Sequence, residues 1–573
     1  MHRNFHRQPP RVTPAPRSAV ATRNMRASSA SRIAPARRSV VVAVEDAPPI
    51  QASRPAPSPR VRGAVGEALP IIALIGAFFV VNDIRSWLTA QYWGDEAWVA
   101  LSVRFPLADL PVTTSSSPIG WSFLLRLVPD IDHLRVVPLG FQLLTVVAAY
   151  FFGRAVGRNR AHGILIGLVT GLVVLLLPAQ QIRHDLKQYT ADAAVAVCLL
   201  ALAAWTEQSW SRRRLAVVVA VVFAGMLVSH TTAIIAPCVF GGLLFAAAVF
   251  SRNWSRTVRT AVAGLAAGGF AAAVYFGVSV RADNDAMHGY WTSYFPTLSS
   301  LPEYLVARIS NLLPLLGVPG WLLVALLLLG VLTLVRQGRP GTGIAILLVP
   351  VVATGLGLAQ IYPLLDLRTS HFLLVLTAVV AGIGVAGLAD LVAMVVRRGR
   401  PVVVSGVICA LLLSSYAVAN QRWWRFDGDE AGLWRNHSAV TTIGSATRYV
   451  ATHAGPNDIV VVAGPAWFGF ALYSDDPLEL VAPISSTVGF TVGMPNRPNV
   501  VLPLIDPAGG ARSIQRALDE ILAKASTRPP GTQVWLIRTY THPSEPDWRA
   551  ALAAYQVRSV TSGPEPVVVI SRR

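Results

Sequence analysis

Gln91-Tyr-Trp-Gly-Asp-Glu-Ala-Trp98 follows directly on the first long hydrophobic segment of the chain, near residues 68–89. It contains the adjacent carboxylates Asp95 and Glu96. Acidic side chains are costly in or beside hydrocarbon, so a carboxylate pair at the mouth of a membrane helix predicts a functional site. The pair also suits a helix N-terminus, because the helix dipole favours acidic residues in the first turn. The two interpretations are compatible.

The rest of the chain has the composition of a multi-pass membrane protein. Its 573 residues are 53% hydrophobic, which excludes an ordinary soluble chain. Apolar runs of about 20 residues recur, the length needed to cross a ~30 Å hydrocarbon core. About eleven spans are predicted, near 68–89, 133–153, 163–180, 190–206, 215–230, 232–250, 260–280, 313–335, 342–362, 371–394 and 401–420.

Arginine placement predicts the orientation of these spans. Five arginine-rich loops alternate along the chain, and all fall on the side of the N-terminus: Arg154–Arg160, Arg212–Arg214, Arg252–Arg259, Arg336–Arg339 and Arg397–Arg400. Because cytoplasmic loops carry the excess of basic residues, the N-terminus is predicted to be cytoplasmic. Asp95, Glu96 and the C-terminal region are then extracytoplasmic, in a plasma membrane.

Residues 1–65 are predicted to form a disordered, basic cytoplasmic tail. They hold twelve arginines against Glu45 and Asp46, among many Pro, Ser and Ala residues. The prolines argue against the alternative of an amphipathic transit peptide. The net charge of +19 lies mainly in this tail and in the loops, so we expect anionic lipid and no nucleic acid as its partner. The near-absence of lysine hints at a GC-rich bacterial genome.

The composition changes after residue 420, which divides the chain into a membrane domain at 66–420 and an extracytoplasmic domain at 421–573. Three short strands are predicted at Ile459–Ala463, Gln533–Ile537 and Val567–Ile570, and helices near 439–453 and 511–526 alternate with them. A small α/β domain is therefore expected. Its predicted roles are to cap the site and to hold an acceptor.

Two outer loops are long. Residues 90–132 contain amphipathic stretches at Asp95–Phe105 and Pro118–Val128, which predict helices lying in the membrane interface. The second loop, at 281–312, contains the aromatic cluster Tyr290–Phe295. Such a cluster suits the membrane boundary or stacking on sugar rings.

A second polar constellation, Arg183-His-Asp-Leu-Lys-Gln-Tyr-Thr-Ala-Asp192, lies between the third and fourth spans on the outer side. On a helix beginning near Asp185, Arg183 and Lys187 would share one face and could hold a phosphate together. The alternative is that the two basic side chains only extend to the interface. Basic residues on the outer side run against the general bias, which favours phosphate binding, with Tyr189 beside them.

A third constellation, Leu364-Leu-Asp-Leu-Arg-Thr-Ser-His371, precedes the tenth span on the outer side. Arg368 and His371, three residues apart, could bind the same phosphate. The alternative is a surface pair between Asp366 and Arg368 that contributes little energy. Arg281 is a further candidate for the phosphate. The chain contains no nucleotide-binding P-loop, zinc-protease motif or nucleophile elbow.

The order of these elements resembles the GT-C glycosyltransferases of the protein O-mannosyltransferase and aminoarabinose-transferase type. In those enzymes a first span leads into an outer loop with an acidic motif and two interfacial helices. Here the second of these helices is matched by Ser117-Pro-Ile-Gly-Trp-Ser-Phe-Leu-Leu-Arg126, and the Lys187-Gln-Tyr189 loop is similar to one in bacterial relatives. The resemblance covers roughly residues 68–400.

The resemblance implies inverting transfer of a sugar from a polyprenyl-phosphate donor outside the membrane, with Asp95 as the base. It also implies a second acidic site, for which Asp185 and Asp192 compete. Asp95 could instead help to bind a divalent cation such as Mg²⁺ or Mn²⁺, with Glu96 in support.

We therefore predict a bacterial hexosyl- or pentosyltransferase with a glycan, lipid or protein acceptor. The alternative is a transporter or flippase of lipid-linked intermediates. It would require charged or helix-breaking positions near mid-membrane in two related halves, and the informative charges here gather at the outer face instead.

Overall fold

The computed structural model describes residues 59–114, 117–183, 185–278, 289–396, 401–425, 442–464, 466–481, 490–503, 505, 509–538, 545–562 and 565–573. The described chain from Pro59 onwards forms one compact unit. The first helix, α1, begins at Pro59, within the segment predicted as a disordered tail. Proline is favoured at this first helical position, since its missing N–H would have no partner there. Residues 1–58 and the candidate Arg281 lie outside the described residues.

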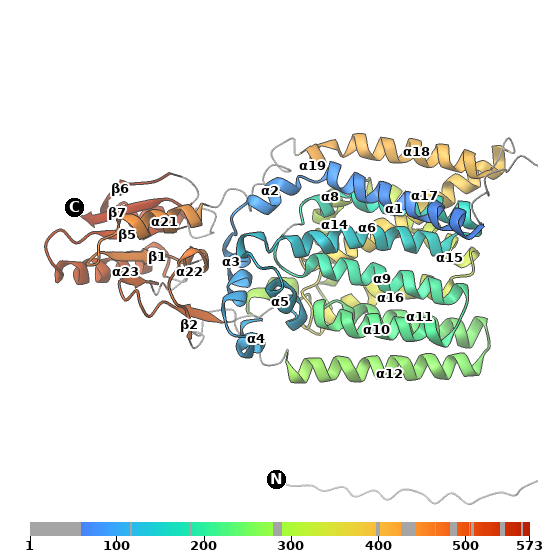
Figure 1. Cartoon of the computed structure of the whole chain (residues 1–573), viewed down its shortest axis with the longest axis horizontal. Coiled ribbons are helices and arrows are strands. Elements are labelled where there is room, and N and C mark those ends of the chain that lie inside the picture. The colour runs from blue at the N-terminus through green and yellow to red at the C-terminus, as the bar shows by residue number, and fades with distance from the viewer. Residues whose placement is uncertain are drawn as a thin grey trace, which may run out of the picture. The chain divides into compact units, whose positions relative to one another are not determined.

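The part of the chain before residue 426 is helical in the described residues (Figure 1). Its longer helices are α1 (Pro59–Val81), α6 (Val136–Val156), α7 (Arg160–Leu175), α9 (Tyr189–Gln208), α10 (Arg212–Val228), α11 (Thr232–Phe245), α12 (Trp254–Gly277), α14 (Leu301–Leu312), α15 (Gly320–Arg336), α16 (Pro340–Leu358), α17 (His371–Val396) and α18 (Pro401–Ala419). Short helices connect them: α2 (Ile84–Thr89), α3 (Gly94–Leu101), η1 (Ser102–Arg104), η2 (Leu107–Asp109), α4 (Leu110–Thr113), α5 (Ile119–Arg126), η3 (Ile131–His133), α8 (Pro178–Gln181), η4 (Ala246–Phe250), η6 (Thr292–Tyr294), η7 (Leu313–Leu316) and α19 (Gln421–Arg425).

Seven helices of the described chain are long and apolar enough to cross a membrane, and one bent pair would make an eighth. The chain is therefore a multi-pass membrane protein. Each of the eleven predicted spans overlaps a helix, but α1, α7 and α10 are shorter or more charged than a typical span. The number eleven stays a prediction.

One continuous span was predicted near 313–335, with the residues before it in the outer loop. Instead α14 and η7 meet α15 at an angle of 82°. The break falls at Gly317, whose φ of 68° lies in the left-handed region that favours glycine. A Cβ at this position would come within 2.4 Å of the Asn420 side chain. The chain therefore turns at Gly317 because glycine alone fits there.

After residue 441 the described chain alternates helices and strands. The helices are α21 (Ile443–His453), α22 (Ala466–Tyr473), α23 (Gly510–Ser526) and α24 (Glu545–Leu552), and the strands are β1 (Ile459–Val462), β2 (Glu479–Val481), β3 (Thr491–Gly493), β4 (Val500–Val501), β5 (Val534–Ile537), β6 (Tyr555–Ser559) and β7 (Val567–Arg572). Five strands form one sheet in the order β4-β1-β5-β7-β6, and β2 and β3 pair separately. β4, β1 and β5 run parallel, whereas β7 is antiparallel to both β5 and β6. The three predicted strands correspond to β1, β5 and β7.

The central strands β1 and β5 are buried on both faces of the sheet. Successive side chains of a strand point to opposite sides, so each strand contributes to two cores. On one face, Val461 and Leu536 pack with α23 and α24. On the other face, Val460 and Ile537 pack with α21 and α22, and this second core continues into α3 and α5 of the outer loop. We call this continuous apolar cluster the shared core. It joins the C-terminal sheet to α5 and to α3, the helix that carries Asp95.

Polar contacts reinforce the shared core. The guanidinium group of Arg104 donates hydrogen bonds to the carbonyl oxygens of Ala471 (2.7 Å), Leu472 (3.2 Å), Ser474 (2.8 Å) and Asp476 (3.0 Å). These carbonyls belong to the last turn of α22 and to the residues just after it, where the helix leaves acceptors without partners and a cation is favourable. Arg104 therefore fastens α22 to the outer loop.

Replacing Arg104 with methionine should loosen this attachment. Hydrogen bonds from a charged donor are worth ~1.5–3 kcal/mol, so amide hydrogen exchange of α22 should rise about 10- to 100-fold. Hydrogen–deuterium exchange with mass spectrometry of the full chain measures the effect. Arg558→Met removes an exposed arginine of β6 and is the control. Equal exchange of α22 in both variants would contradict the assigned role.

Candidate active site

Asp95 and Glu96 occupy the first turn of α3, as the sequence pattern predicts. The Glu96 carboxylate accepts a hydrogen bond from the backbone N–H of Trp93 at 3.4 Å, which helps to close the helix N-terminus. Adjacent residues of a helix point in different directions. The two carboxylates therefore enter different surroundings.

Glu96 is fully buried in an ion pair with Arg135. The guanidinium group donates to the Glu96 carboxylate at 3.0 and 2.6 Å, and the backbone N–H of Leu186 donates to it at 3.1 Å. Arg135 also donates to the carbonyl oxygens of Trp87 and Gln91 and lies over the ring of Tyr92. Glu96 thus ties α3 to the chain around α6 and to the loop before α9. It has no open face for a substrate.

Asp95 lies in the first turn of α3 and pairs with Arg368. Their side chains meet at 2.9 Å, and 39% of the Asp95 side chain is exposed. Arg368 also donates to the Tyr290 hydroxyl at 2.9 Å and lies 5.6 Å from the Trp291 ring centroid. The structure therefore brings together the first predicted carboxylate, the third polar constellation and the aromatic cluster.

Lys187 supplies a second cation beside Asp95. Its ammonium group lies 4.9 Å from the ring centroid of Trp98, on the same helix as Asp95. Burial lowers the pKa of Lys187, the Asp95 carboxylate opposes this shift, and Arg368 adds to it. The Trp98 indole in turn donates to the carbonyl oxygen of Phe490 at 3.2 Å. Trp98 therefore connects Lys187 with the shared core.

Arg183 and Asp185 form a buried pair at 3.1 Å, and Arg183 lies over the ring of Tyr189. Within the described residues, Arg183 Nε and Asp185 Oδ1 lack hydrogen-bond partners. Buried polar groups of this kind cost free energy until a polar ligand or water satisfies them. The predicted helix from Asp185 is wrong, because α9 begins at Tyr189. Arg183 and Lys187 instead lie in the irregular segment before α9, and Asp185 interacts with both.

Two other candidates lie in separate contacts. His371 faces the Gln180 side chain, with Nε2 and Oε1 3.1 Å apart, and it is fully buried at the start of α17. Asp192 accepts hydrogen bonds from the hydroxyl groups of Ser229 (2.6 Å) and Thr231 (3.3 Å), in the turn between α10 and α11. Neither forms a contact with Asp95. Of the two candidates for the second acidic position, Asp185 is the one that acts electrostatically on Lys187.

The surroundings of Asp95 are poorly suited to a divalent cation. Mg²⁺ and Mn²⁺ prefer several oxygen ligands of negative or neutral charge. Asp95 instead faces the cations Arg368 and Lys187. Among the described residues, no three His, Cys, Asp or Glu side chains converge. We therefore derive no step through a metal.

Sequence reasoning missed Arg135 and Trp98. Arg135 stands just before α6 on the predicted outer side, and such an arginine departs from the positive-inside pattern. That departure is a usable signal. Trp98 has none, because a tryptophan in an amphipathic helix is usually part of the core.

The fold is similar to that of two solved membrane proteins. The structure of ArnT from Cupriavidus metallidurans bound to undecaprenyl phosphate superposes with a TM-score of 0.51 and 14% identity, covering 88% of this chain and 98% of ArnT. The archaeal oligosaccharyltransferase AglB from Archaeoglobus fulgidus, in complex with an inhibitory peptide and a dolichol-phosphate, superposes with a TM-score of 0.50 and 10% identity. That match covers 88% of this chain and 74% of AglB. No family model and no curated protein sequence matches the chain.

Both similar structures belong to the GT-C superfamily, so the chain has the GT-C fold that its sequence predicts. At these identities the likeness concerns the fold. The role of each side chain must be argued from the contacts described above.

Proposed function

We propose that the chain is a glycosyltransferase that moves a sugar from a polyprenyl-phosphate donor to an acceptor hydroxyl at the extracytoplasmic face of the plasma membrane. The observation that carries this proposal is the Asp95–Arg368 pair beside Lys187 in a GT-C fold. One partly exposed carboxylate and two cations provide a base and a binding site for a phosphate. The undecaprenyl phosphate and dolichol-phosphate bound to ArnT and AglB support a lipid-linked donor.

The proposed step is a single displacement with inversion. The acceptor oxygen attacks the anomeric carbon while the Asp95 carboxylate removes the acceptor proton. The bond between the anomeric carbon and the phosphate oxygen breaks, and polyprenyl phosphate leaves with the electron pair. The proton resides on Asp95 and then passes to water. Atoms and charge balance without a nucleotide or a metal.

Lys187 and Arg368 stabilise the leaving phosphate in this proposal. Arg368 presents a planar fork of donors, and Lys187 acts as a compact charge. The negative charge on the phosphate grows as the bond breaks, so preformed cations lower the barrier. Arg183, Tyr189 and Asp185 complete the polar wall behind Lys187.

Tyr290 and Trp291 are assigned to the sugar. Arg368 holds the Tyr290 hydroxyl at 2.9 Å, and the two aromatic rings meet edge to face with centroids 4.8 Å apart. Tyr290 is 55% exposed, so its ring is available for stacking. This placement favours the sugar-stacking interpretation over a membrane belt.

Glu96 is proposed as a positioning residue, since its carboxylate is fully used by Arg135 and Leu186. It fixes the first turn of α3 and therefore the direction of Asp95. The buried His371 and Asp192 are assigned a structural role, which is to stabilise the packing of the surrounding helices. Arg281 stays a candidate for the phosphate.

Donor affinity should depend on pH through Lys187. Because burial lowers the pKa of Lys187, its charge is lost on raising the pH before an ordinary lysine would titrate at about 10.4. The apparent KM for the donor should therefore rise in alkaline buffer. Lys187→Gln should raise that KM about 10- to 100-fold at neutral pH.

Lys187→Arg is the matched variant, since arginine stays charged above pH 12. It should retain donor binding and remove the alkaline rise in KM. A native pH profile that persists in Lys187→Arg would assign the titration to another group.

The test of the proposed function is a panel of radiolabelled polyprenyl-phosphate sugars, hexoses and pentoses, presented to the purified full chain in vesicles. Transfer or slow hydrolysis of one donor supports the enzyme and names the sugar. Movement of intact donors across the bilayer without any sugar release would instead favour the flippase.

A further inference from the structure

A cavity of about 350 Å³ lies at the end of the helix bundle opposite Asp95. Helix α9 locates it, because α9 begins at Tyr189, beside Lys187, and ends at Gln208, next to the lining residue Glu207. A helix of 20 residues is about 30 Å long. The cavity is therefore about one membrane core away from the candidate active site.

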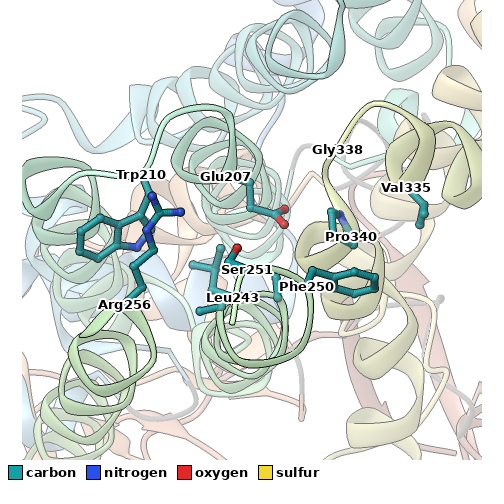
Figure 2. Close-up of a pocket in the computed structure, with 11 residues that line it drawn as sticks. Glu207, Trp210, Leu243, Phe250, Ser251, Arg256, Val335, Gly338 and Pro340 are labelled. Atoms are coloured by element: carbon teal, nitrogen blue, oxygen red, sulfur yellow. The ribbon is translucent and has the colours of Figure 1, made fainter. Parts of the chain in front are cut away.

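The wall of the cavity is mostly apolar. It is formed where α9, α11 with η4, α12, α15 and α16 meet (Figure 2), and its apolar lining consists of Leu243, Ala246, Ala247, Phe250, Val335 and Pro340. Phe250 is 59% exposed and Val335 is 46% exposed, so this wall continues onto the surface that faces lipid. The η4 segment is a π-helical turn, which widens the end of α11 at this point.

Arg256 is the one arginine in the lining of the cavity, and Arg259, three residues further along α12, approaches the same lining residue, Trp210. The guanidinium carbon of Arg256 lies 5.5 Å from the ring centroid of Trp210, and that of Arg259 lies 5.7 Å from the same centroid. Figure 2 shows Arg256 extended alongside the indole. Within the described chain neither arginine forms an ion pair with an acidic side chain. The two cations therefore flank one aromatic ring without neutralisation.

Glu207, the one carboxylate in the lining, is already engaged. Its oxygens accept hydrogen bonds from the backbone N–H groups of Gly341 (2.7 Å) and Thr342 (2.8 Å) and from the Thr342 hydroxyl (2.6 Å). These bonds cap the N-terminus of α16. Glu207 is therefore directed at α16, and Arg256 and Arg259 are left to meet a ligand.

We propose that this cavity binds the headgroup of an anionic phospholipid, with its phosphate at Arg256 and Arg259 and an acyl chain along Phe250 and Val335. Basic pockets between membrane helices on the cytoplasmic side suit such headgroups. Both arginines lie in the first turns of α12, within one of the five arginine-rich segments predicted to face the cytoplasm. A free phosphate would use the two cations but would leave the apolar wall uncovered. The site is independent of the transfer reaction proposed above.

Equilibrium binding to the purified full chain tests this assignment. The titrants are dioleoyl-phosphatidylglycerol, dioleoyl-phosphatidylcholine and inorganic phosphate, each added to protein in a neutral detergent. The protein should prefer phosphatidylglycerol over phosphatidylcholine. Arg256→Gln and Arg259→Gln should each weaken phosphatidylglycerol binding about 5-fold. Arg252→Gln removes an exposed arginine of the same loop outside the cavity and should leave binding unchanged.

A second variant tests the apolar wall and does not depend on the arginines. Phe250 is mostly exposed, so Phe250→Ala should fold normally. It should weaken binding of dioleoyl-phosphatidylglycerol. Binding of dihexanoyl-phosphatidylglycerol should not change, because its short acyl chains would not extend along Phe250. An equal loss in Arg252→Gln, or equal binding of phosphatidylcholine, would reduce the effect to general surface attraction and overturn the proposal. Displacement of the lipid by millimolar inorganic phosphate, with no effect of Phe250→Ala, would assign the site to a free anion.

Discussion

Asp95→Asn is expected to lower the rate of sugar transfer by about 10²–10⁴-fold, the contribution typical of a positioned general base. Asparagine keeps the size of the side chain but cannot take the acceptor proton. Because Asp95 is 39% exposed, the substitution should leave the fold intact. The measurement is release of radiolabelled sugar from the donor that the native chain turns over. The KM for that donor should change much less than kcat.

Asp109→Asn is the matched control for this experiment. Asp109 lies in the same outer loop, within η2, and has no role in the proposed step. Transfer should proceed in this variant at the native rate. Normal transfer by Asp95→Asn, with the same donor, would remove Asp95 from the proposed step.

Arg135→Met should have the largest effect on stability. The substitution leaves the Glu96 carboxylate buried without its cation, and breaking a buried pair in this way costs about 3–5 kcal/mol. The carbonyl oxygens of Trp87 and Gln91 also lose their donor. The expected result is a markedly lower midpoint of thermal unfolding in detergent.

Two further variants test whether the loss of stability arises because the Glu96–Arg135 pair is buried. Arg154 pairs with Glu67 at 2.9 Å, but the two side chains are 26% and 33% exposed. Arg154→Met should therefore cost less than about 1 kcal/mol. The double variant Glu96→Gln/Arg135→Met should be more stable than Arg135→Met alone, since it buries no unpaired charge. Equal unfolding midpoints for Arg135→Met and Arg154→Met would contradict a structural role for the Glu96–Arg135 pair.

Local patterns in the sequence predicted most of the long helices and three of the strands, but not α14, α22, α24, β2, β3, β4 or β6. Long apolar runs gave the membrane helices, and the short apolar runs after residue 420 corresponded to β1, β5 and β7. The acidic pair fell in the first turn of α3, where the helix dipole favours it. The GT-C fold followed from the order of these elements, and the solved structures agree.

The contacts within the site depend on distant parts of the chain. Asp95 and Arg368 are 273 residues apart in sequence, and no local pattern specifies their pairing. In the sequence, Asp95 and Glu96 form a single acidic motif. In the structure, Glu96 is buried in an ion pair, whereas the side chain of Asp95 is partly exposed. Arg368 and His371 were expected to act together, but the burial of His371 against Gln180 separates them.

The shared core ties the maturation of the site to the order of synthesis. Trp98, which carries Lys187 on its ring, receives its hydrogen-bond partner Phe490 only 392 residues later in the chain. A ribosome makes α3 long before the strands that complete its packing. In the predicted orientation those strands must first cross the membrane. Under the proposed function, a chain anchored in the bilayer would therefore gain its complete site only once its C-terminal sheet has been translocated.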